Sequence, residues 1–278
     1  MKPLEDKILG DGLYGRVQIV IDKEGCRYAA KRFLRSRCKE FSSEFTLLAQ
    51  LQHKNIVRYI GLAAPFDPNE HPAIVMELMD IDLHSQLVSS QTMNFSRRLK
   101  ILRDIAEGLN FLHSYSPKII HRDLTAKNIL LDSAGLAKIA DFGNSRMVSQ
   151  EQLTTMTSNI GTLVYLAPEA HGNSYSEKVD IFSYGHLMLF IFIREFPSNL
   201  LPASYYDKDP GNGIDCVPIV CLEVDRRKHY LKTLEQQTDN DTSILQVMKE
   251  CLSNKAADRP TASQLITFTD CCSIPNEQ

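Results

Sequence analysis

The stretch His121-Arg122-Asp123-Leu124-Thr125-Ala126-Lys127-Asn128, followed by the apolar Ile129-Leu130-Leu131, decides how this chain is interpreted. Asp123 and Asn128 lie five residues apart, so one loop can present a carboxylate and an amide together. A carboxylate can accept the proton of a substrate hydroxyl, and an amide oxygen suits Mg²⁺ as a ligand. The stretch therefore predicts a loop on which Asp123 is a general base and Asn128 holds a metal ion.

A second carboxylate stands in Asp141-Phe142-Gly143, directly after the short apolar run from Lys138 to Ala140. Mg²⁺ prefers hard oxygen ligands and keeps phosphate oxygens in its coordination shell. Asn128 and Asp141 together therefore suit two Mg²⁺ ions that bridge a triphosphate.

The N-terminal segment Gly10-Asp11-Gly12-Leu13-Tyr14-Gly15-Arg16-Val17 spaces its glycines so that a hairpin can lie close over phosphates. The alternative is a turn that needs glycine for steric reasons alone. The segment lacks the Lys-Ser/Thr ending of a P-loop, and residues 17–21 continue as a strand where a dinucleotide fold needs a helix. The pattern thus favours a strand–loop–strand lid.

Lys31 lies on an apolar face of the strand predicted over 28–33. A lysine in such a place usually extends its ammonium to water. Glu44, however, falls on the otherwise apolar stripe of the helix predicted over 38–50, and a buried carboxylate is costly unless it is paired. We therefore expect Lys31 and Glu44 to form one ion pair that directs the ammonium at nucleotide phosphates.

The periodicity of the chain changes after its first third. Apolar alternation predicts strands over residues 17–21, 28–33, 56–62 and 73–78, whereas helical spacing dominates after residue 80, with Ser96 as the expected N-cap of the first long helix. Residues 144–160 show neither pattern, residues 202–215 indicate a loop, and the apolar stretch 181–193 predicts a buried helix too short to cross a bilayer. The result is a small β-rich lobe and a larger α-rich lobe that join near 79–82.

Six motifs stand in order: the glycine loop, Ala29-x-Lys31, the helix residue Glu44, His121-Arg122-Asp123-x4-Asn128, Asp141-Phe142-Gly143 and Ala167-Pro168-Glu169. In this order the sequence resembles the eukaryotic protein kinase family over essentially its whole length. The resemblance implies an α+β, bilobal protein kinase fold and a single kinase domain over 1–278. The N-lobe, with strands and one main helix, is expected over about 1–79, and the hinge and α-helical C-lobe over about 80–278. It also implies ATP in the cleft, with Mg²⁺.

The resemblance implies a role for each matching position. Lys31 contacts the α- and β-phosphates and pairs with Glu44, Asp123 is the catalytic base, and Mg²⁺ is held by Asn128 and Asp141. The phosphates are covered by Gly10, Gly12 and Gly15, and the adenine ring is sandwiched by Val17, Ala29 and Leu130. Met76 is the gatekeeper, the adenine hydrogen-bonds to the backbone of Glu77 and Met79, and the ribose is reached by Asp82.

Other matches imply structural roles. Glu169 is expected to pair with Arg259, and Asp180 is expected to accept backbone amides of the catalytic loop. The side chains of His121, Phe142 and Leu48 are expected to stack into a column that joins the two lobes.

The choice of acceptor hydroxyl rests on two conflicting features. Lys127 lies four residues after Asp123, as the basic residue often does in tyrosine kinases, and would supply positive charge near the γ-phosphate. Gly161-Thr162, with Thr162 able to hydrogen-bond Asp123, is instead similar to Ser/Thr kinases. The mixture resembles the tyrosine-kinase-like group, so we expect Ser/Thr phosphorylation of protein substrates. A tyrosine or dual-specificity kinase is the first alternative, and a pseudokinase scaffold that acts through partners is the second.

Two arginines suggest a regulatory phosphate. Arg122 precedes the catalytic Asp and Arg146 follows Asp-Phe-Gly by three residues, so both guanidiniums could gather a phosphate on the loop between them. The candidates are Thr154, Thr155, Thr157 and Ser158, and the alternative is that these are ordinary polar loop residues.

Composition excludes several other classes of protein. The 278 residues are 43% hydrophobic and 23% charged with a net charge of −3, and no clustered positive field marks a nucleic-acid binder. The seven cysteines contain no metal-like Cys-x-x-Cys pair, which fits free thiols in a reducing compartment. Because no apolar signal segment opens the chain, we expect a cytoplasmic domain without membrane insertion. The substrate and any regulatory partners are left open.

Overall fold

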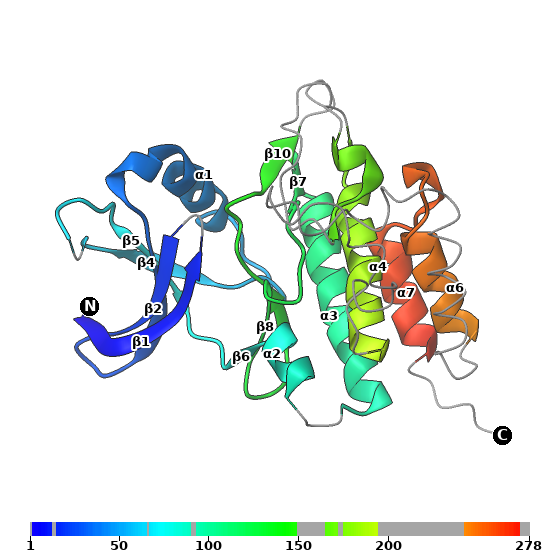
Figure 1. Cartoon of the computed structure of the whole chain (residues 1–278), viewed down its shortest axis with the longest axis horizontal. Helices are drawn as coiled ribbons and strands as arrows, with labels where there is room; N and C mark the ends of the chain where they lie inside the picture. Colours follow the sequence, from blue (N-terminus) through cyan, green and yellow to red (C-terminus); the bar gives the residue numbers. More distant parts are fainter. Residues whose placement is uncertain are drawn as a thin grey trace, which may run out of the picture.

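The computed structural model describes residues 2–12, 15–65, 67–89, 93–148, 165–171, 175–193 and 242–272. Its N-terminal part is a five-stranded antiparallel sheet in the order β1-β2-β3-β5-β4. These strands are β1 (Lys2–Gly12), β2 (Gly15–Ile21), β3 (Arg27–Arg32), β4 (Tyr59–Ala63) and β5 (Ala73–Glu77). Between β3 and β4 come the short helix η1 (Arg35–Arg37) and α1 (Cys38–Leu48). Figure 1 shows this sheet and α1 at one end of the molecule and the long helices at the other.

The C-terminal part begins with β6 (Ile81–Asp82) and is mainly helical. Its helices are α2 (Leu83–Val88), α3 (Phe95–His113), η4 (Pro168–His171), α4 (Lys178–Ile193), α6 (Thr242–Cys251), η8 (Ala256–Asp258) and α7 (Ala262–Cys272). Its short strands are β7 (Lys118–Ile120), β8 (Ile129–Leu131), β9 (Ala137–Ile139) and β10 (Arg146–Val148), which form the sheets β10-β7 and β6-β8-β9. The architecture confirms the predicted α+β fold with a β-rich N-lobe and a helical C-lobe.

Helix α4 is the core of the C-lobe. It is apolar around its whole circumference, and its side chains from Ile181 to Ile191 are buried, as expected for a helix with packing partners on all sides. The predicted buried helix over 181–193 is thereby confirmed. In the described part of the chain, no helix combines the length and the apolar character that a membrane span requires.

Three local predictions are wrong. Helix α3 begins at Phe95, and its N-cap is Asn94 instead of Ser96, because the Asn94 side chain accepts the Arg97 N–H at 2.8 Å. The segment 144–160 contains a strand, β10, which pairs with β7 and is too short for a period-2 pattern to show. The strand predicted from Ile56 starts only at Tyr59.

The late start of β4 has a physical reason. The segment that follows α1 is bonded to the C-lobe: the Val57 N–H donates to the Ile139 carbonyl at 2.9 Å, and the Ile139 N–H donates to the Asn55 carbonyl at 2.9 Å. The Asn55 side chain also donates to the Ala137 carbonyl at 3.0 Å. On α3, a Cβ at Gly108 would lie 2.9 Å from the Asn55 carbonyl oxygen, so the absence of a side chain permits this contact. The segment after α1 therefore lies on β9 and α3, outside the N-lobe sheet.

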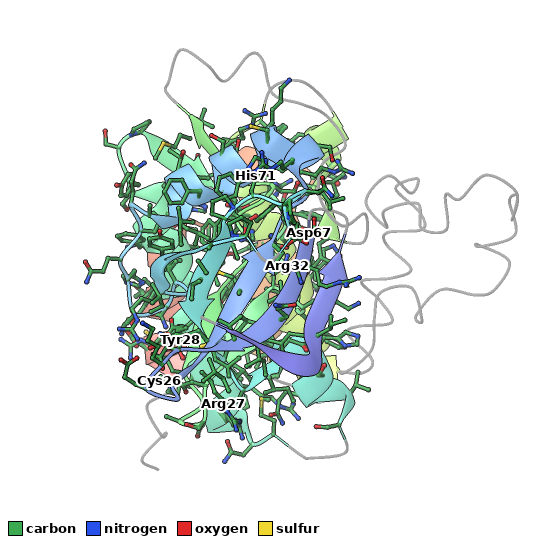
Figure 2. All side chains as sticks on the ribbon, turned by 90° about the vertical axis from the view of Figure 1, so that its left-hand side faces the viewer. Cys26, Arg27, Tyr28, Arg32, Asp67 and His71 are labelled. Atoms are coloured by element: carbon green, nitrogen blue, oxygen red, sulfur yellow. The ribbon has the colours of Figure 1, made fainter. Side chains whose placement is uncertain are left out.

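Polar contacts stabilise the N-lobe sheet and its β2–β3 turn. Arg32 donates to both carboxylate oxygens of Glu70 at 2.7 and 2.6 Å, and Asp22 accepts the N–H groups of Glu24 and Cys26 within the β2–β3 turn. Figure 2 shows Cys26, Arg27 and Tyr28 at one end of the sheet and Asp67 and His71 toward the other, with Arg32 between them.

Gly15 permits the close pairing of β2 with β3. An added Cβ would lie 2.3 Å from the Arg32 carbonyl oxygen, which is far below any normal contact distance. We expect Gly15→Ala to destabilise the N-lobe by about 1–3 kcal/mol, because the two strands must separate to relieve this overpacking. Thermal unfolding followed by circular dichroism measures the change. The matched control is Gly61→Ala in β4, where no atom lies within 4 Å of the added carbon; equal melting temperatures for both variants would contradict the assignment.

Candidate active site

A buried lysine joins three elements. Lys31 on β3 places its Nζ 2.8 and 2.7 Å from the two carboxylate oxygens of Glu44 on α1. The same Nζ lies 2.7 Å from Asp141 Oδ1, which follows β9 in sequence. The ion pair expected between Lys31 and Glu44 is present, and the contact with Asp141 is one that sequence reasoning did not predict. One ammonium is thus hydrogen-bonded to two carboxylates.

Burial and charge act in opposite directions on this group. Burial alone would lower the pKa of Lys31, but the charges and hydrogen bonds of Glu44 and Asp141 raise it above its ordinary value. Burial raises the pKa of Glu44 to about 7, and only the opposing effect of Lys31 keeps it from rising further. For Asp141, burial would raise the pKa, yet Lys31 and the Gly143 amide hold it below its ordinary value. Near neutral pH the ionised state of Glu44 therefore depends on the ammonium.

The catalytic-loop residues lie together as predicted from their spacing. The amide Nδ2 of Asn128 donates to the Asp123 carbonyl at 2.8 Å and to Asp123 Oδ2 at 3.3 Å. Because Nδ2 is used in this way, the Asn128 side chain offers its oxygen to a cation. The Asp141 side chain is 38% exposed, so its carboxylate is accessible as well. These two oxygen donors fit Mg²⁺.

Asp180 at the start of α4 holds the backbone of this loop. Its carboxylate accepts the N–H of His121 at 2.9 Å and the N–H of Arg122 at 2.8 Å, as predicted. It also lies 2.9 Å from Nε2 of His113. Arg122 has φ = 66°, in the left-handed region that a non-glycine residue adopts at a cost. The fixed acceptor in α4 compensates for that strain.

A second strained residue is Asp141. Asp141 has φ = 63°, and its neighbour Phe142 is fully buried with its ring centroid 5.1 Å from that of His121. His121 Nε2 lies 3.0 Å from the Ala140 carbonyl. Leu48 of α1 is buried in the same hydrophobic core as Phe142, and its stacking in the column stays a prediction.

The positions predicted to contact adenine come from the sheet and from β8. Ala29 and Met76 are buried and opposite each other on β3 and β5. Leu130 on β8 is half-buried and pairs with Asp82, and Val17 on β2 is half-buried and pairs with Lys31. Their contacts with a nucleotide stay predictions.

Two hinge predictions acquire constraints from the structure. The Glu77 N–H already donates to the Arg58 carbonyl at 3.0 Å, which limits its adenine contact to its own carbonyl. Asp82 is the N-cap of α2, and its oxygens accept the N–H and hydroxyl of Ser85 at 2.8 and 2.7 Å. A ribose would have to share these oxygens with Ser85. Met79 is half-buried between β5 and β6.

The remaining candidates lie at the edge of the site. Gly12 pairs with Gly15 and Gly10 with Val17, so the three glycines lie at the adjoining ends of β1 and β2. Lys127 is exposed. Thr162 and the four phosphorylation candidates over 154–158 lie outside the described residues.

Arg122 is less available for a regulatory phosphate than its sequence position suggests. Its side chain is buried, with Nε donating to the Asn144 carbonyl at 2.6 Å and Nη1 donating to the Tyr175 hydroxyl at 3.0 Å. Arg146 is exposed. Sequence reasoning also missed Asn144, whose amide Nδ2 lies 3.3 Å from Asp123 Oδ2. A lone asparagine in a loop carries no periodic signal that could have revealed it.

The predicted pair of Glu169 and Arg259 is confirmed. The two guanidinium nitrogens Nη1 and Nη2 lie 2.5 and 2.8 Å from the two carboxylate oxygens. The guanidinium also lies 4.9 Å from the centroid of the Phe182 ring on α4. Because the arginine side chain is fully buried, this bidentate pair joins η4 to the C-lobe core.

Comparisons with known proteins agree with this geometry. The family model for the protein kinase domain matches residues 4–268. Cysteine-rich receptor-like protein kinase 6 of Oryza sativa subsp. japonica is 34% identical over 282 residues, covering 94% of this chain and 38% of the relative. Receptor-like serine/threonine-protein kinase SD1-7 of Arabidopsis thaliana is 32% identical over 281 residues, covering 95% of this chain and 32% of the relative. The chain thus spans less than half the length of these relatives.

Asp180 gives the site a pH-dependent component of stability. Burial would raise its pKa, but His113, His121 and the backbone amide of His121 lower it below the ordinary value. A carboxyl whose pKa is depressed in the folded state contributes stability above about pH 4, and this contribution disappears as the pH falls through the folded-state pKa.

We therefore expect Asp180→Asn to cost about 2–3 kcal/mol at pH 7, because it weakens the acceptor of two buried amides. The difference from wild type should narrow below about pH 4. Urea unfolding at both pH values measures it. Asp270→Asn, which removes only an exposed pair with Arg103, is the control. A cost for Asp180→Asn that is equal at both pH values would contradict the prediction.

Proposed function

Since this chain belongs to the protein kinase domain family, we propose that it transfers the γ-phosphoryl group of ATP to Ser or Thr hydroxyls of protein substrates. The observation that carries the proposal is the contact of Lys31 Nζ with both Glu44 and Asp141, with Asp123 and Asn128 on the adjoining loop. Positioning and charge stabilisation are what phosphoryl transfer chiefly requires of a protein. The residues to which we assign a role in the reaction include Lys31, Glu44, Asp123, Asn128 and Asp141.

Each residue has a role in the proposed mechanism. Lys31 holds the α- and β-phosphates of ATP, and Glu44 keeps its ammonium in place. Asp123 accepts the proton of the substrate hydroxyl as the hydroxyl oxygen attacks the γ-phosphorus. Lys127 supplies positive charge beside the γ-phosphate. Gly10, Gly12 and Gly15 cover the phosphates, so that water is excluded from the transferred group.

The chemistry of the donor set fits a divalent ion that arrives with the nucleotide. Asn128 and Asp141 would hold Mg²⁺, which would neutralise charge on the phosphate oxygens when bound. Within the described residues, no cluster of three or more His, Cys, Asp and Glu side chains could hold a metal ion by itself. Phosphate oxygens would complete the coordination shell.

The adenine is proposed to lie among Val17, Ala29 and Leu130, with the Glu77 carbonyl and the Met79 backbone as its hydrogen-bonding partners and Asp82 at the ribose. The side chain of Met76 would limit the depth of the space beside the adenine. We further propose that residues 1–278 act as one kinase domain in the cytoplasm, and that a phosphate within 154–158 regulates it.

The assignment to Ser and Thr has support from sequence relatives. The names of similar proteins include serine/threonine-protein kinases, and Gly161-Thr162 is similar to the same class. A tyrosine or dual-specificity kinase is the alternative acceptor class, because Lys127 is placed as in tyrosine kinases. A pseudokinase scaffold is disfavoured, because Lys31, Asp123 and Asp141 are all in place.

Three substitutions test the catalytic roles. Asp123→Asn should lower kcat by about 10²–10⁴-fold, as expected for loss of a general base. Lys31→Met and Asp141→Asn should abolish nearly all turnover while the protein stays folded. Transfer of radiolabelled phosphate with Mg²⁺-ATP measures activity, and circular dichroism measures folding. Lys39→Met, at an exposed position on α1, is the matched lysine control and should keep full activity. Equal, weak labelling by wild type and Asp123→Asn would favour the scaffold.

A peptide library with Ser, Thr or Tyr as the single acceptor tests the substrate class. We expect phosphate incorporation into Ser and Thr peptides and at least ten times less into matched Tyr peptides, since the Gly161-Thr162 pattern is of the Ser/Thr type. Comparable incorporation into Tyr peptides would establish dual specificity instead.

A further inference from the structure

Asn144 is the residue after Asp141-Phe142-Gly143, and it contacts the catalytic loop twice. Its backbone carbonyl accepts Arg122 Nε at 2.6 Å. Its side-chain Nδ2 lies 3.3 Å from Asp123 Oδ2. The side chain is only 8% exposed, and a buried amide is costly unless it is hydrogen-bonded. The contact with Asp123 therefore accounts for a polar side chain in a buried position.

Two amides converge on one carboxylate oxygen. Asp123 Oδ2 accepts a hydrogen bond from Nδ2 of Asn128, in the same loop, at 3.3 Å. It accepts a second from Nδ2 of Asn144, in the segment after Asp141-Phe142-Gly143, at 3.3 Å. A carboxylate that is bonded from two sides at one oxygen has a restricted rotation about χ2. The direction in which its second oxygen points is restricted with it, and that direction matters for proton abstraction.

Asn144 is also closely linked to Asp141. The Gly143 N–H donates to Asp141 Oδ1 at 3.3 Å, and the Ser145 N–H donates to the Phe142 carbonyl at 3.0 Å. The segment 141–145 is therefore a hydrogen-bonded turn that contains both Asp141 and Asn144. A displacement of this turn would move the carboxylate at 141 and the amide at 144 together.

We propose that Asn144 is a positioning residue for phosphoryl transfer: its amide orients the Asp123 carboxylate and ties that orientation to the placement of Asp141. The proposal rests on the proposed function, because it acts through Asp123 as the base. Asn144 itself touches neither nucleotide nor acceptor in this scheme. The side-chain amide can be removed without loss of the bond from Arg122, since that bond ends on the backbone carbonyl.

A double-mutant cycle isolates the effect. Asn144→Leu keeps a similar volume and removes the donor, and we expect it to slow the single-turnover transfer rate by about 10-fold, the worth of one hydrogen bond to a charged group. The KM for ATP should stay within about 2-fold, because no nucleotide contact is lost. In an Asp123→Asn background, where the oriented base is already gone, Asn144→Leu should change the residual rate by less than about 2-fold. Rapid-quench measurements with Mg²⁺-ATP and a Ser peptide give all four rates.

Ser145→Ala is the matched control from the same turn. Ser145 is buried, and its hydroxyl donates to the carbonyl of His121 at 3.2 Å, so its side chain bonds to the backbone of the loop. Any rate change in Ser145→Ala should therefore be the same in the wild-type and Asp123→Asn backgrounds. The melting temperature of every variant is measured, and Asn144→Ala replaces Asn144→Leu in the cycle if the leucine variant does not fold.

The outcomes separate the two proposals. An unchanged rate in Asn144→Leu, or a loss that persists undiminished in the Asp123→Asn background, would overturn the positioning role while the kinase assignment stands. If Asp123→Asn alone costs nothing, the proposed base is wrong, and with it the function on which this inference depends.

Discussion

The shared ammonium of Lys31 is the interaction on which the site depends. It lies 2.7 Å from Glu44 Oε2 and 2.7 Å from Asp141 Oδ1, and the side chains of Lys31 and Glu44 are almost completely buried. Three buried or half-buried charges are tolerable only as a group, because each would be costly alone. The contact therefore requires β3, α1 and the segment after β9 to hold one relative arrangement. Any movement of α1 away from the sheet would separate Glu44 from the ammonium and leave Lys31 paired with Asp141 alone.

A second constraint acts on the backbone conformation of the residues around the site. Arg122 and Asp141 both have positive φ, at 66° and 63°, although neither is glycine. Such conformations cost about 1–3 kcal/mol each and persist where surrounding structure holds them. For Arg122 that structure is Asp180, which is fully buried in α4 and accepts its N–H. The apolar helix at the centre of the C-lobe thus serves as the rigid support for a strained catalytic loop.

Sequence reasoning succeeded where chemistry depends on residues close together along the chain. The spacing of Asp123 and Asn128 was enough to predict that they share a loop, and the buried place of Glu44 in an apolar stripe was enough to predict its pairing with Lys31. Contacts between distant segments, such as that of Glu169 with Arg259, were predicted only through the resemblance to protein kinases. Where the resemblance did not describe such a contact, the prediction failed. Ile56 has the pattern of a strand residue, yet its segment pairs with β9. The contact of Asn144 with Asp123 arises from the turn at 141–145, which no periodicity describes.

The segment that was wrongly predicted to be part of β4 holds the two lobes in a fixed relative position. The segment after α1, which carries Asn55 and Val57, is hydrogen-bonded to β9 at Ala137 and Ile139. Two residues beyond the end of β9 the chain reaches Asp141. The positions of Glu44 and Asp141 therefore both depend on β9. Glu44 is tied to β9 by the hydrogen bonds of the segment that follows α1, and Asp141 is tied to it because it follows β9 directly in the chain. Only Lys31 of the three belongs to the N-lobe sheet, so its ammonium is the point where the sheet contacts Glu44 and Asp141. A nucleotide held between that sheet and Asp141 would act directly on this contact.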